Sequence, residues 1–205
     1  KNWRKRQGFG TGTLGDMGCH IFNAMYRGLA LTSPKRVRSN TPVPNQYNWT
    51  GNERIEYGFP GTKYTNGDLK VFWLSGKHRP PKALTRHIPE GIKYRFGCLL
   101  KGDEGLLLLR HGSIPVLLPD KKFASVRPKK LKPISHHEAF INAVLDGNRE
   151  HLLSPIDYAA SGRELDETVV VRVRDEEMAA RKGDDGCRAA EVGAQLVILR
   201  EGGHR

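Results

Sequence analysis

Asp16 and His20 are the two side chains in this sequence whose types and spacing best suit chemistry. They stand four residues apart, so a helix through them would place both on one face, one turn apart. A carboxylate in that position can orient an imidazole and stabilise its protonated form, as a proton-transfer pair requires. The same spacing is typical of the solvated face of an ordinary helix, and spacing alone favours that second interpretation.

The elements that must position this pair are a glycine-rich loop and the helix that follows it. Apolar residues recur at helical spacing and predict a helix over residues 14 to about 31. Its apolar face would consist of Leu14, Met17, Ile21, Met25 and Leu29. The opposite, polar face would carry Asp16, His20, Asn23 and Arg27.

The loop itself has the spacing Gly10-x-Gly12-x-x-Gly15, which matches a dinucleotide-binding pattern as a string of letters. That pattern needs an apolar strand before it, whereas residues 1–9 are basic. We therefore interpret the glycines as positions where the backbone turns sharply and approaches another surface closely.

The N-terminal segment resembles the start of the C-terminal domain of Gfo/Idh/MocA-type oxidoreductases, in particular its bacterial variety. Asn2-Trp3-Arg4 and residues 10–20 carry the resemblance, because they place Asp16 and His20 at the family's Asp-x-x-x-His pair. Further similarity lies in residues 68–73, 101–105, 136–140 and 154–159. Asn23 departs from the family, which often has Asp there, and the resemblance becomes faint from Ser161 onward.

The resemblance implies the substrate-binding and oligomerisation part of an NAD(P)-dependent oxidoreductase that acts on a sugar or polyol hydroxyl. The site residues that it implies are His20 and Asp16 for catalysis, Trp3, Arg4 and Asn23 for substrate binding, and Gly12 and Gly15 for contact with the cofactor. Two alternatives stay open. One is an NAD-dependent glycosidase of the same architecture, and the other is a non-catalytic basic binding module.

The resemblance also divides the chain. Residues 1–160 correspond to the C-terminal domain, and residues 161–205 form a divergent tail whose native folding stays open. The family's N-terminal Rossmann domain, which holds most of the NAD or NADP site, is not part of this sequence. We therefore expect the chain to be a fragment that is inactive alone, with a carbohydrate substrate, the missing domain and further copies of itself as partners. Self-association would run through the sheet.

Composition and residue spacing argue against several other kinds of binding site and against a membrane span. The net charge is +12, yet no nucleic-acid-binding signature accompanies it, so a nucleic-acid partner is not expected. The three cysteines lack the spacing of a zinc site, and no metal is expected. No apolar run is long enough for a membrane span. The compartment stays open, with the cytoplasm expected and the periplasm an alternative if an export signal lies upstream.

The remaining segments predict an α+β fold, with an open, mostly antiparallel sheet and helices packed on one face. Strands are expected at residues 53–59, 68–74, 94–100, 106–109, 169–173 and 195–199, and an edge strand at 116–118. A helix is expected at residues 136–145, with Ser135 as its N-cap. Its buried side would consist of Phe140, Ile141, Val144 and Leu145.

Overall fold

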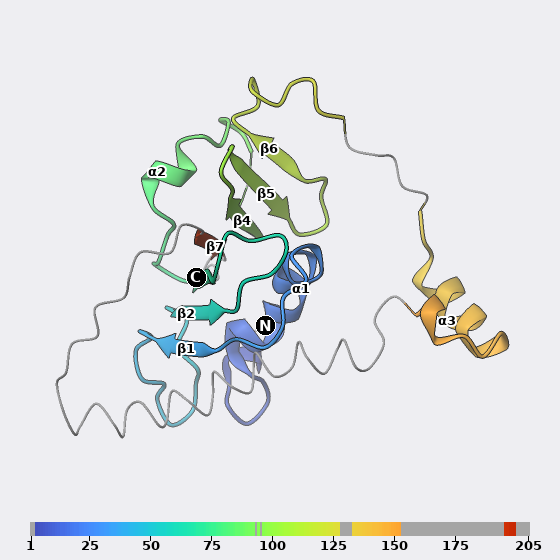
Figure 1. The fold of residues 1–205 in the computed structure, drawn as a ribbon. Helices are drawn as coiled ribbons and strands as arrows, with labels where there is room; N and C mark the ends of the chain where they lie inside the picture. Colours follow the sequence, from blue (N-terminus) through green and yellow to red (C-terminus); the bar gives the residue numbers. More distant parts are fainter. Residues whose placement is uncertain (1–2, 93, 95, 128–132, 153–194, 200–205) are drawn as a thin grey trace.

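The computed structural model describes residues 3–92, 94, 96–127, 133–152 and 195–199 (Figure 1). The helices are η1 (Trp3–Lys5), α1 (Gly12–Gly28), α2 (Lys82–Thr85), α3 (His136–Leu145) and η2 (Arg149–His151). The strands are β1 (Arg36–Ser39), β2 (Arg54–Phe59), β3 (Leu69–Leu74), β4 (Gly97–Lys101), β5 (Leu106–Arg110), β6 (Val116–Leu118) and β7 (Gln195–Leu199).

The strands form one sheet in the order β1-β2-β3-β7-β4-β5-β6. Neighbouring strands are antiparallel except β3 and β7, which are parallel. β7 therefore joins two antiparallel groups, β1–β3 and β4–β6. The expectation of an α+β fold with an open, mostly antiparallel sheet is confirmed. The predicted strand at residues 195–199 and the edge strand at 116–118 are confirmed with it.

α1 covers one face of the sheet through the apolar side that its spacing predicts. Leu14, Ile21 and Met25 are buried, and Met17 and Leu29 pack against the same core while partly exposed. Phe22 and Tyr26 widen this side beyond the prediction. The sheet contributes alternate residues to the same cluster, namely Val37, Ile55, Tyr57, Phe59, Leu69, Val71, Trp73 and Cys98. The helix ends at Gly28, before the predicted end at residue 31.

The opposite face of the sheet has a core of its own near β3 to β6. Leu99, Leu106, Leu108 and Leu118 are buried there, together with partly buried side chains from the connection between β3 and β4. The one-turn helix α2, which the sequence did not predict, lies in that connection and supplies Leu84. Because Cys98 of β4 belongs to the core under α1, the sheet is covered on both faces at β4.

The predicted buried side of α3 is wrong. Phe140, Ile141, Val144 and Leu145 are exposed to 61%, 52%, 65% and 76%. The bounds of the helix and its N-cap are correct, since Ser135 Oγ accepts a hydrogen bond from the Glu138 amide over 3.2 Å. α3 lies well away from the sheet (Figure 1), so among the described residues its apolar side chains have no core to pack against.

Two further differences concern strands. β1 was not predicted, because its four residues include only one apolar side chain, Val37. β4 begins at Gly97 and not at residue 94, and Tyr94 packs on the core from outside the strand. The predicted strand at residues 169–173 lies outside the described residues.

Candidate functional site

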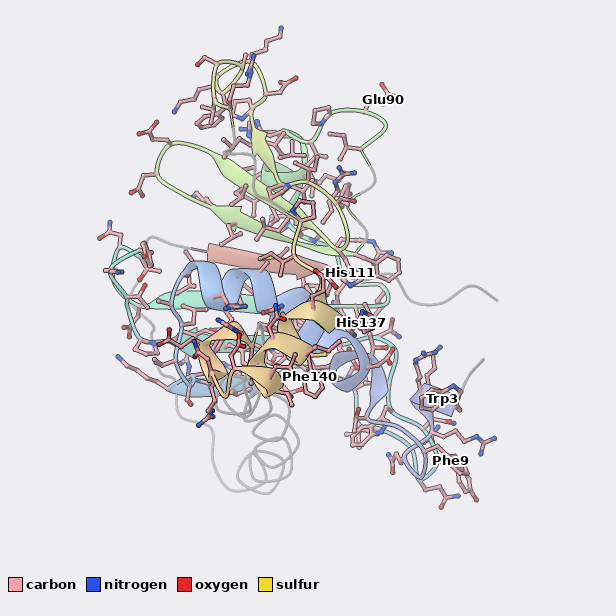
Figure 2. The ribbon with its side chains drawn as sticks, turned by 90° about the vertical axis from the view of Figure 1, so that its right-hand side faces the viewer. Trp3, Phe9, Glu90, His111, His137 and Phe140 are labelled. Atoms are coloured by element: carbon pink, nitrogen blue, oxygen red, sulfur yellow. The ribbon has the colours of Figure 1, made fainter. Side chains whose placement is uncertain are left out.

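Arg4 and Asp16 are brought together at the start of α1. Arg4 Nε donates a hydrogen bond to Asp16 Oδ1 over 2.8 Å. The guanidinium also stands 4.8 Å from the centre of the Trp3 ring, so the three side chains form a continuous chain. Trp3 and Phe9 mark this end of the molecule (Figure 2).

The segment around Trp49 holds the glycine-rich loop in this position. The indole Nε1 of Trp49 donates to the carbonyl of Gly10 over 2.7 Å, and its amide donates to the carbonyl of Lys5, also over 2.7 Å. The amide of Gln7 donates to the carbonyl of Tyr47 over 3.0 Å. These bonds fix the path of the chain between η1 and α1, and with it the place of Arg4.

His20 follows Asp16 by one turn of α1 and is exposed on the polar side of the helix. Its ring meets the ring of His111 edge-on, with the ring centres 5.5 Å apart and the planes at 82°. His111 comes directly after β5 and was not predicted as a site residue. A lone histidine in a turn between strands carries no sequence signal, and only the packing of α1 beside the β5–β6 turn brings the two rings together.

The structure therefore groups most of the predicted site residues. Asp16 and His20 share the polar side of α1, and Trp3 and Arg4 join them through the ion pair. Asn23 is exposed further along the same helix.

The glycines of the loop are packed against the chain itself. A Cβ on Gly12 would stand 3.1 Å from the Trp49 side chain, and a Cβ on Gly15 would collide with the Thr11 hydroxyl. A Cβ on Gly10 would stand 2.6 Å from the carbonyl oxygen of Arg4. The chain's own atoms therefore occupy the space beside each of these glycines. A pyrophosphate could not approach the loop backbone from that side. Contact of Gly12 and Gly15 with a cofactor held by another domain stays a prediction.

Comparison with known proteins gives no indication of the function of this site. No family model matches the sequence, and no curated protein matches it.

Among the described residues, no group of three or more His, Cys, Asp or Glu is arranged to hold a metal ion. Cys98 is fully buried, and this burial raises the pKa of its thiol well above the ordinary value. Cys19 is exposed on α1. Within the same part of the chain, no helix is long and apolar enough to cross a bilayer.

Sequence reasoning also missed a buried carboxylate, that of Glu53. Its Oε2 accepts hydrogen bonds from Trp73 Nε1 over 2.7 Å and from Ser75 Oγ over 3.0 Å. The amide of Glu53 donates to Ser75 Oγ over 3.1 Å. This network ties the residue before β2 to the residue after β3, so we assign it to the stability of the sheet.

Proposed function

We propose that this chain is the C-terminal, substrate-binding part of an NAD(P)-dependent oxidoreductase that acts on a sugar or polyol hydroxyl. The observation that supports the proposal is the arrangement on α1. The helix presents Asp16 and His20 one turn apart on its solvent-facing side, and Arg4 fixes the carboxylate from outside the helix. Side chains one turn apart on a helix are neighbours, so this arrangement is consistent with the proposed pairing of the two groups.

In the proposed reaction, a ring nitrogen of His20 takes the proton of the substrate hydroxyl. NAD or NADP, held mainly by a separate N-terminal domain, supplies the hydride acceptor when it is bound. We assign Asp16, one turn away on the same helix, the role of orienting the imidazole for this step. Arg4 holds one oxygen of that carboxylate and so fixes its orientation.

Substrate binding is assigned to Trp3, Arg4 and Asn23. Trp3 is 53% exposed, and an aromatic face of this kind suits the apolar face of a sugar ring. Arg4 and Asn23 supply donors and an acceptor for hydroxyl groups.

The test uses a protein in which the proposed NAD(P)-binding domain precedes this chain. We expect His20→Ala and Asp16→Asn each to lower kcat by about 100-fold or more with sugar or polyol substrates. Arg27→Ala is the matched control, because Arg27 is also exposed on the polar side of α1, and it should change kcat by less than about twofold. A loss of less than about tenfold in both site variants would refute the assigned roles.

The same assay separates the outcomes of the reaction. Steady growth of reduced cofactor with free sugars supports the dehydrogenase. Release of an aglycone without net reduction of the cofactor supports the NAD-dependent glycosidase in its place. The absence of turnover on either class of substrate would favour the non-catalytic alternative.

A further inference from the structure

The face of strands β1–β3 that lies opposite α1 is basic. Val37, Ile55, Tyr57, Phe59, Leu69, Val71 and Trp73 point toward α1, so the residues between them point the other way. Those residues include four cations, namely Arg36 and Arg38 on β1, Arg54 on β2 and Lys70 on β3. We call these four residues the basic sheet face.

The positive charge of this face is barely compensated within the three strands. Glu56 is their one acidic residue, and its Oε1 accepts from Arg36 Nη2 over 2.9 Å. The Glu56 side chain is only 17% exposed, whereas that of Arg36 is 51% exposed. Arg36 and Arg38 are exposed to solvent, whereas Arg54 and Lys70 are half-buried. Leu84 and Tyr94 cover Phe72 and Leu74 at the β3 edge of this face, so its open part lies mainly over β1 and β2.

The neighbouring connection after β3 extends the positive field. His78 lies between Lys77 and Arg79, and Arg54 of the basic sheet face is also close enough to act on it. Burial lowers the pKa of His78, and the charges of Lys77, Arg54 and Arg79 lower it further. Lys77 and Arg79 therefore add positive charge beside Arg54.

The shape and chemistry of the face restrict what it can bind. Stacking a second copy on it would bring like charges together, which costs free energy, so this face does not suit the self-association through the sheet that the resemblance implies. A protein partner needs apolar anchors, yet Phe72 is only 9% exposed and has the Arg54 guanidinium 5.7 Å from its ring centre. Single-stranded nucleic acid needs exposed aromatic platforms for its bases, and the outward-facing residues of β1–β3 offer none.

A duplex phosphate backbone meets these restrictions. Alternate residues of a strand stand about 7 Å apart and neighbouring strands about 5 Å apart, so the cations form a closely spaced array on one face. Arginine binds phosphate through two parallel N–H donors, and contacts of this kind need no apolar anchor. We propose that the basic sheet face binds the phosphate backbone of duplex nucleic acid without sequence preference, although the sequence alone did not lead us to expect a nucleic-acid partner. This surface lies across the sheet from α1, so the proposal is independent of the proposed enzymatic function.

The experiment measures binding of the full chain to a fluorescein-labelled DNA duplex of mixed sequence by anisotropy, at several salt concentrations. The variant Arg38→Gln/Lys70→Gln removes two charges and leaves the Arg36–Glu56 pair intact. We expect about tenfold weaker binding at low salt. The plot of the logarithm of the binding constant against the logarithm of the salt concentration should become less steep, by about two.

The matched control is Lys101→Gln/Lys121→Gln, which removes the same charge from β4 and from the turn after β6. It should weaken binding by less than about twofold, and circular dichroism should show that both variants fold. Equal losses in the two double variants would mean diffuse attraction by net charge and would overturn the proposal. Failure of the wild-type chain to bind duplex at low salt would do the same. So would tighter binding of heparin or of single-stranded DNA than of duplex at the same salt concentration.

Discussion

Arg4 Nε and Asp16 Oδ1 stand 2.8 Å apart and join the segment before the glycine-rich loop to the first turns of α1. This bond links a predicted substrate-binding residue directly to a predicted catalytic one. It also gives the Asp16 carboxylate one defined orientation, because an arginine donor is directional. The proposed chemistry thus depends on a contact between two residues twelve positions apart in sequence.

Arg4→Ala should lower the free energy of unfolding by less than about 1 kcal/mol, because the pair is partly exposed and exposed ion pairs are weak. Urea unfolding followed by circular dichroism measures this change. Lys35→Ala, which breaks the exposed Lys35–Asp68 pair, is the control and should behave alike. A loss above about 2 kcal/mol for Arg4→Ala alone would show that Arg4 carries packing as well as charge.

Gly12→Ala should destabilise the protein by about 1–3 kcal/mol. Gly12 has a φ of +75°, and the added Cβ would press against Trp49. Gly28→Ala is the matched control, because nothing lies within 4 Å of a Cβ there. Since alanine favours helix, Gly28→Ala should be neutral or stabilise by up to about 1 kcal/mol. Thermal unfolding of both variants would contradict this if their Tm values moved together.

Glu53→Ala should cost about 3 kcal/mol or more, because it leaves the indole N–H of Trp73 and the hydroxyl of Ser75 without their shared acceptor. Glu53→Gln keeps an acceptor oxygen and should cost clearly less. Urea unfolding monitored by tryptophan fluorescence measures both. Equal costs would show that the negative charge, and not the hydrogen bonds, is what matters.

The pKa of His78 should lie below its ordinary value, chiefly through burial and then through Lys77, Arg54 and Arg79. A lowered histidine pKa means that the unfolded chain takes up the proton first. Stability should therefore fall as the pH drops through about 6.5 and level off below the folded pKa. Arg54→Gln should raise the His78 pKa in an NMR titration, whereas Lys101→Gln should leave it unchanged.

Polar substitutions on α3 should leave the stability of the sheet intact. Val144→Ser and Leu145→Ser remove exposed side chains, so each should change the free energy of unfolding by less than about 0.5 kcal/mol. Leu108→Ala removes a fully buried side chain and should cost about 2–5 kcal/mol. A large loss from Leu145→Ser would mean that this face of α3 is covered in solution.

Local sequence patterns were enough to predict the individual elements. The spacing from Leu14 to Leu29 predicted α1 and the side that it buries, because the period of a helix is set by backbone geometry. Ser135 predicted the start of α3, since an N-cap bonds an amide three residues away. The shared face of Asp16 and His20 followed from the same periodicity.

Which elements pack against one another becomes visible only in the folded protein. α1 and α3 have the same kind of apolar spacing, yet one side of α1 is buried whereas Phe140 and Leu145 on α3 are exposed. Periodicity shows which side of a helix is apolar, but it does not show what that side packs against. The Arg4–Asp16 bond, the His20–His111 contact and the basic sheet face each join residues that are distant in sequence. Such contacts depend on how strands pair and how helices pack, and no local pattern of residues encodes that choice.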